Sequence, residues 1–241
     1  MQALSFEHGE GPGPEILCIG AHCDDIEIGC GGTVLALQRR FPGCRIHWFV
    51  VTSDAERRME ALAAMHAMVG KAARGEMWIG DLPDGFLPAR FEAAKGLFQR
   101  VGAAVRPDLI LTHHARDRHQ DHALVSEMTW QTFRNHLIWE YEIPKYDGDL
   151  ATPCLYVPLA ATIAERKVRT ILRAFKSQAP KPWFRAENLL AVMHLRGLEC
   201  RAAGGYAEGF HCRKVVFDAG GSPSPKGRAT AKRRATAGMQ S

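Results

Sequence analysis

The sequence predicts an α/β protein with a mostly parallel β-sheet flanked by helices, and three observations support this fold class. Short apolar runs alternate with helix-favouring segments of about 10 to 15 residues, which is the pattern of βαβ units. The 241 residues, 46% of them hydrophobic, suffice for one large domain with a sizeable core. No internal repeat or linker divides the chain. We therefore expect a single domain over residues 1–218, followed by a low-complexity, disordered basic tail over 219–241.

The first half of the chain predicts four strands in order. ILCIGA (16–21) is an apolar run stopped by charge, as in a buried parallel strand. RIHWFVVTS (45–53) is rich in β-branched and aromatic residues, and EMWIGD (76–81) and DLILTHH (108–114) follow. A glycine-rich turn after the first strand leads into a helix over 33–40. Further helices are expected over 55–69, ending at Gly70, over 90–105, ending before Pro107, and over 121–134.

The second half predicts a strand over 137–143, a short strand CLYVPL, two helices near 160–177 and 185–202, and a closing strand KVVF over 214–217. In open parallel sheets, ligands bind beyond the carboxyl ends of the strands. Chemistry is therefore expected directly after these ends.

Charge and cysteine content exclude several classes of protein. Lys and Arg outnumber Asp and Glu by 31 to 26, but five unopposed basic residues after Asp218 account for the excess, so no nucleic-acid partner is expected. No segment approaches the roughly 20 apolar residues of a membrane span, and the acidic N-terminus does not resemble a signal peptide. Seven scattered cysteines fit free thiols. We expect a cytoplasmic protein.

Two of the expected strand ends are dense in ionisable residues. The first strand is followed by His22-Cys23-Asp24-Asp25-Ile26-Glu27, and the fourth by His113-His114-Ala-Arg116-Asp117-Arg118-His119-Gln120-Asp121-His122. Imidazoles with carboxylates form a ligand set that suits zinc and leaves room for water. Neighbouring aspartates point in different directions, so one can bind metal while the other acts as a base.

Each piece also has a simpler interpretation. Asp24-Asp25 could cap a helix, and a single histidine at a strand end is more often a capping loop residue than a ligand. Gly29, Gly31 and Gly32 alone are weak evidence for a nucleotide site, because the third glycine of the dinucleotide fingerprint is missing. Isolated Cys23 and Cys30 are usually small core residues. The combination of two acidic, histidine-bearing loops favours a metal site.

These loops resemble the two motifs of the PIG-L (LmbE-like) deacetylases. AHCDDIEIGCGGT is similar to the family signature A-H-P-D-D-x-x-x-G-x-G-G-T, and Asp117-x-His119-x-Asp121-His122 is similar to D-x-H-x-D-H. The resemblance extends to Arg57-x-x-Glu60, Asp84-Gly85, Ser177-Gln178 and Tyr206-Ala-Glu208-Gly-Phe210. Cys23 replaces the usual proline, which would place an oxidisable thiol beside the metal without altering a ligand position.

The resemblance implies a Rossmann-like α/β fold and zinc-dependent hydrolysis of an N-acetyl group on an amino sugar. It implies that one zinc is bound by His22, Asp25 and His122, that Asp24 is the general base, and that His119 stabilises the tetrahedral intermediate or protonates the amine. We expect nearby carboxylates to keep His119 protonated. Asp121 would orient an active-site histidine, and Arg57 and Asp84 would contact the sugar.

The expected function is thus removal of acetate from an N-acetylglucosamine-type sugar or glycoside by a metal-dependent deacetylase. The alternatives are hydrolysis of another amide or ester bond in a glycan or antibiotic pathway, and a non-catalytic sugar-binding relative. A two-metal phosphatase would need more bridging carboxylates than the motifs provide. A homo-oligomer is possible, since members of the family are often oligomers.

Overall fold

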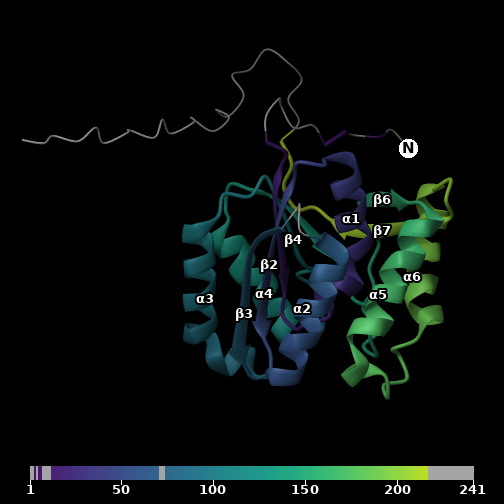
Figure 1. Cartoon of the computed structure of the whole chain (residues 1–241). Helices are drawn as coiled ribbons and strands as arrows, with labels where there is room; N and C mark the ends of the chain where they lie inside the picture. Colours follow the sequence, from purple (N-terminus) through teal and green to yellow (C-terminus); the bar gives the residue numbers. More distant parts are fainter. Residues whose placement is uncertain (1–2, 4, 7–11, 71–73, 217–241) are drawn as a thin grey trace, which may run out of the picture.

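The computed structural model describes residues 3, 5–6, 12–70 and 74–216. Its sheet has seven strands in the order β3-β2-β1-β4-β5-β7-β6. Figure 1 shows the sheet between its flanking helices. The five parallel strands are β1 (Glu15–Gly20), β2 (Arg45–Thr52), β3 (Arg74–Leu82), β4 (Leu109–His113) and β5 (Leu137–Tyr141). Strands β6 (Leu155–Leu159) and β7 (Tyr206–His211) extend the sheet through antiparallel pairing. The expected fold class, an α/β protein with a mostly parallel sheet, is confirmed.

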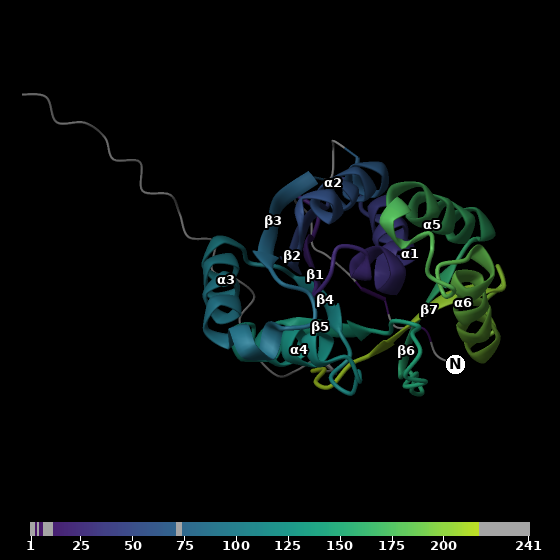
Figure 2. The same ribbon diagram turned by 90° about the horizontal axis from the view of Figure 1, so that it is seen from below.

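Helices cover both faces of the sheet, as Figure 2 shows from below. On one face lie α1 (Asp25–Arg40), α2 (Ala55–Val69), α5 (Ala161–Ala174) and α6 (Ala186–Cys200). On the other lie α3 (Phe91–Ala104) and α4 (Gln120–Thr132). Two short 3₁₀ turns, Leu87–Arg90 and Lys176–Gln178, complete the elements. In β1, Ile16 and Cys18 face the first layer while Leu17 and Ile19 face the second, so this strand is buried on both sides.

The first helix differs from the expectation. The glycine-rich segment after β1 was expected as a turn, but α1 begins at Asp25 and contains Gly29, Gly31 and Gly32. A Cβ at Gly32 would lie 2.5 Å from Leu159 Cδ1, and one at Gly31 would lie 2.9 Å from Met68 Cε. These glycines therefore allow close packing of the helix, which outweighs their poor helix propensity.

The predicted position of the last strand was also wrong. KVVF was expected to close the sheet, whereas residues 206–211 form the final strand among the described residues. Residues 214–216 are not in a strand, and Val215 and Val216 are 62% and 79% exposed. The observed strand is held by buried Glu208, whose carboxylate accepts hydrogen bonds from Gly32 N (2.8 Å), Thr33 N (2.6 Å) and Lys167 Nζ (2.6 Å). Such long-range contacts leave no mark on local strand propensity.

The strand order brings the two loops rich in ionisable residues together. The chain adds strands in one direction from β1 to β3 and in the other from β4 onward, and β1 and β4 pair in parallel. The carboxyl ends of these two strands therefore lie side by side. No helix in the described ranges is long and apolar enough to cross a membrane. The predicted tail, 219–241, lies outside the described residues, and the boundary at 218 stays a prediction.

Candidate metal centre

The three predicted metal ligands converge at the adjoining ends of β1 and β4. His22 Nδ1 lies 3.0 Å from His122 Nε2 and 3.3 Å from Asp25 Oδ2, and His122 Nε2 lies 3.5 Å from Asp25 Oδ1. Ligands at about 2.0–2.2 Å from a tetrahedral zinc are separated by about 3.3–3.6 Å. All three residues are buried. The donor atoms and their spacing therefore fit a zinc ion.

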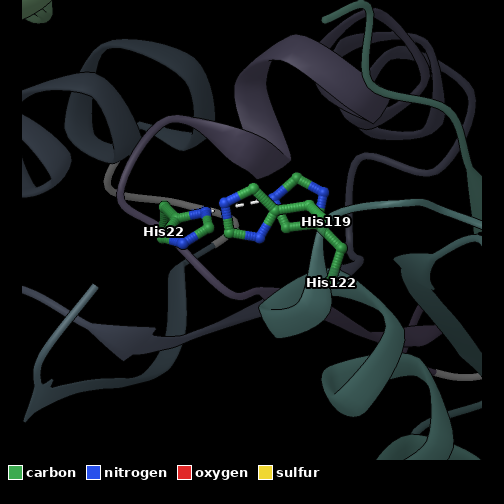
Figure 3. A group of neighbouring side chains, drawn as sticks. All are labelled: His22, His119 and His122. Carbon is green, nitrogen blue, oxygen red and sulfur yellow. Dashed lines mark hydrogen bonds between the residues drawn. The ribbon is translucent and has the colours of Figure 1, made fainter. Parts of the chain in front are cut away.

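Two elements supply these ligands. His22 belongs to the loop after β1 and Asp25 begins α1, while His119 and His122 lie at the start of α4; Figure 3 shows the three imidazoles together. The rings of His119 and His122 stack with their centroids 4.5 Å apart. Other groups of three could also hold an ion: His22 with His119 and His122, Asp25 with His113 and His122, and His22 with Asp84 and Asp121. Donor atoms in each of these groups lie within 4.8 Å of one another. The contacts of the predicted set use both oxygens of Asp25, Oδ2 toward His22 and Oδ1 toward His122.

The ligands carry opposite charges. Burial favours a neutral His22, but Asp25, Asp121 and Asp84 outweigh it and raise the pKa of His22 well above its ordinary value. Burial likewise disfavours a charged Asp25, but the imidazoles of His122, His113 and His22 hold its pKa well below the usual range. Because a coordinating histidine must be neutral, metal binding at this site would release a proton from His22.

The predicted base, Asp24, is hydrogen-bonded to Arg57. Its Oδ1 accepts a hydrogen bond from Arg57 Nη2 at 2.7 Å, and its side chain is 8% exposed. Burial raises the pKa of Asp24, and Arg57 only partly offsets this. Arg57, predicted to contact the sugar, is thus engaged with the base, and its Nε lies 3.7 Å from Glu60 Oε2.

Asp121 and Asp84 both contact His22. Asp121 Oδ2 lies 3.3 Å from His22 Nε2, and its carboxylate also accepts from Gly85 N (2.7 Å) and Leu87 N (3.1 Å). Asp121 therefore lies behind His22, and its predicted orienting role stays a prediction. Asp84 Oδ1 lies 2.9 Å from the same Nε2, and its side chain is 64% exposed. An exposed carboxylate therefore lies beside His22, and its predicted contact with a sugar stays a prediction.

His119 differs from the expectation in its charge. We expected nearby carboxylates to keep it protonated, but burial, followed by repulsion from His122 and His22, lowers its pKa. The backbone amide of Asp121 donates to His119 Nδ1 at 3.3 Å, so the neutral ring carries its proton on Nε2. His119 is thus a neutral hydrogen-bond donor rather than a cation.

Sequence reasoning assigned no role to two residues that contact the ligands. His113 is fully buried, stacks on His122 at 4.0 Å, and lies 3.1 Å from Asp25 Oδ2. Asp117 Oδ2 accepts from His122 Nδ1 at 2.9 Å, which is the usual carboxylate support of a metal-binding histidine. Asp117 opens the second motif, so its spacing could have signalled this role; His113 is recognisable only as a histidine at a strand end.

Cys23 does not form an exposed thiol beside the metal. It is 2% exposed, its Sγ donates to Thr52 O at 3.5 Å, and burial raises its pKa to about 12. The expected oxidation sensitivity is therefore not supported, because the reactive thiolate is disfavoured.

Comparison with known proteins gives a family match and several structures of the same fold. Residues 17–133, which contain both motifs, match the model of the family PIG-L, described as GlcNAc-PI de-N-acetylase. The conserved protein TT1542 from Thermus thermophilus is 23% identical with a TM-score of 0.67, covering 90% of this chain and 100% of that one.

Two further solved structures share the fold. N,N'-diacetylchitobiose deacetylase from Pyrococcus horikoshii is 20% identical with a TM-score of 0.63, covering 83% of this chain and 84% of that one. GalB, the 4-carboxy-2-hydroxymuconate hydratase from Pseudomonas putida KT2440, is 16% identical with a TM-score of 0.64, covering 85% and 99%. Since proteins with different reactions share this fold, function must be argued from the site.

Proposed function

We propose that this chain removes the acetyl group from an N-acetylated amino sugar. The match of residues 17–133 to the PIG-L family, which confirms the resemblance carried by the two motifs, supports this proposal. The family match supports an enzyme of the deacetylase class. The observation that carries the proposal is the meeting of His22, Asp25 and His122 within 3.5 Å of one another, with Asp24 next in sequence to a ligand.

Zinc is the metal we propose for these residues. Two imidazoles and one carboxylate are a common catalytic zinc set, which leaves a coordination position open. When bound, the ion would lower the pKa of a water molecule and polarise the acetyl carbonyl group. Asp117 and Asp121 would orient His122 and His22 by accepting hydrogen bonds from their outer ring nitrogens.

The chain's own groups supply the proton transfers. Asp24, whose pKa is raised by burial, would accept the proton of the attacking water and later pass it to the departing amine. Arg57 holds one carboxylate oxygen of Asp24, which leaves the other oxygen for this task. The Nε2–H of His119 would donate to the oxygen on which negative charge develops.

We propose an N-acetylglucosamine-type sugar or glycoside as the substrate. The family description names a GlcNAc-PI de-N-acetylase, and one structure of the same fold is an N,N'-diacetylchitobiose deacetylase. In this chain, Asp84 is the exposed carboxylate beside His22 and would accept a hydrogen bond from a sugar hydroxyl. The competing possibility is another amide or ester of a glycan.

The test is acetate release from a panel of N-acetylated sugars, with O-acetyl esters and simple amides as comparison substrates. Asp24→Asn should retain bound zinc and lose at least about 100-fold in kcat/KM. Asp25→Asn, its matched control, should instead lose zinc, as measured by metal analysis after dialysis, because an amide is a poorer zinc ligand than a carboxylate. A fully active Asp24→Asn variant would refute the role of Asp24, and hydrolysis of esters alone would refute the amide substrate.

A further inference from the structure

The segment between β5 and β6 contains a lysine that reaches the metal centre from outside both motifs. Lys145 Nζ lies 2.8 Å from Asp117 Oδ2, 2.8 Å from Asp149 Oδ2 and 3.1 Å from Ile143 O. Its side chain is 13% exposed. The ammonium group donates hydrogen bonds to Asp117 and to Ile143 O, and it forms an ion pair with Asp149. Lys145 is therefore a structural cation held by groups of the protein.

Asp117, the partner of Lys145, touches two histidines of the site. Its Oδ2 accepts from His122 Nδ1 at 2.9 Å and its Oδ1 accepts from the backbone amide of His119 at 2.8 Å. The Asp117 side chain is only 3% exposed, so its charge needs a nearby cation to offset the cost of burial. Lys145 supplies that cation at the same oxygen that holds His122.

Asp149 fixes the other side of Lys145. Its Oδ2 accepts the backbone amide of Arg118 at 2.7 Å, one residue after Asp117. Lys145 is thus held between two carboxylates, one on the second motif and one on its own segment. This arrangement ties residues 145–149 to the turn that carries Asp117 and His119.

We propose that Lys145 is a positioning residue: by fixing Asp117 against His122, it sets the affinity of the centre for its metal. The inference rests on the proposed metal site. Without Lys145, Asp117 would keep its bond to His122 but lose the charge that holds it in place. His122 would then be less firmly oriented, and affinity would fall.

The remainder of the segment is anchored independently of Lys145. The amide of Ala151 donates to Glu142 Oε1 at 3.2 Å, and Arg196 Nη2 donates to Ala151 O at 2.8 Å. Arg196 is itself paired with Glu142 at 2.9 Å. Replacing Lys145 should therefore leave the chain folded.

The experiment measures the affinity of the purified full chain for Zn²⁺ by competition with a chromophoric chelator. Lys145→Met should weaken the affinity about 3- to 10-fold, less than the 10- to 100-fold typical of a direct partner of a ligand. Lys145→Arg should restore most of it, because arginine keeps the charge. Lys95→Met is the matched control, since Lys95 bonds Gln131, near the opposite end of α4 from His122. The Zn²⁺ affinity of this variant should equal that of the wild type.

Folded Lys145→Met protein that binds Zn²⁺ as tightly as the wild type would overturn the proposal, as would a failure of Lys145→Arg to recover affinity. If Lys145→Met does not fold, Asp149→Asn provides the test, because it frees one side of Lys145 and should weaken Zn²⁺ binding by a smaller factor; unchanged binding would again overturn it. Wild-type protein without Zn²⁺ affinity would instead refute the proposed metal site itself.

Discussion

Replacement of Gly29 by alanine tests whether the glycines of the first motif serve packing. A Cβ at Gly29 would lie 2.6 Å from Tyr141 Cγ and 2.7 Å from Cε2. Tyr141 is fully buried, and its hydroxyl donates to Ile19 O at 2.6 Å, so the ring has little room to move. Because real Cβ atoms do not approach a ring so closely, helix and strand must separate.

The expected loss in the free energy of unfolding follows from three contributions. Overpacking costs about 1–3 kcal/mol, and loss of the buried tyrosine hydrogen bond costs about 1 kcal/mol. Helix propensity returns about 1 kcal/mol for glycine to alanine. The net loss is about 1–3 kcal/mol, which corresponds to a fall in Tm of about 2–12 °C for a domain of this size.

Thermal unfolding followed by circular dichroism measures this change, and Gly96→Ala is its control. Gly96 also lies within a helix, but the nearest atom to its Cβ would be Arg100 Nη1 at 3.7 Å, so this substitution should raise stability. A Gly29→Ala protein as stable as Gly96→Ala would refute the packing explanation.

Four further predictions concern buried charges and thiols. Lys167→Met should lower the unfolding free energy by about 3–5 kcal/mol in urea titrations, because it leaves the buried carboxylate of Glu208 without its cationic partner. Adding Glu208→Gln should recover part of the loss. Asp117→Asn should weaken Zn²⁺ binding about 10- to 100-fold in chelator competition; equal affinity would contradict its role. Iodoacetamide at about pH 8 should modify exposed Cys154 and spare Cys23 in native protein, as mass spectrometry would reveal. Burial lowers the pKa of His47, whose Nδ1 accepts a hydrogen bond from Glu76 N, so on acidification His47 takes up a proton in the unfolded chain before it does so in the folded one. The unfolding free energy should therefore fall as pH drops through about 6.5. In denaturation measurements across this pH range, His47→Asn should show a smaller fall in unfolding free energy than the wild type.

The parallel half of the sheet, and the presence of ionisable loops at two strand ends, could be predicted from the sequence because both depend on local patterns. Buried parallel strands are continuous apolar runs, and parallel topology brings the ends of β1 and β4 together. Because β1 and β4 are neighbours in the sheet, His22 and His122 meet although 100 residues separate them. The roles of these residues came from the resemblance and remain proposals.

The remaining features depend on contacts between distant segments. Local propensity disfavours a helix through Gly29, Gly31 and Gly32, and only the neighbours Tyr141, Met68 and Leu159 explain it. The valines of KVVF favour a strand, yet the chain pairs residues 206–211 instead. Lys145 lies 28 residues from Asp117 in an irregular segment, where no periodicity marks it.

The balance of buried charge supports a divalent cation independently of the ligand distances. Asp24 and Asp117 each have a cationic partner, Arg57 and Lys145 respectively. Among the described residues, Asp25 and Asp121 contact imidazoles and backbone amides and form no ion pair with a lysine or an arginine. Two buried carboxylates without a fixed cation are costly, and protonated histidine can offset only part of that cost. A divalent ion bound between His22, Asp25 and His122 would offset both charges, so the burial of so many acids at one sheet edge is itself a reason to expect a metal there.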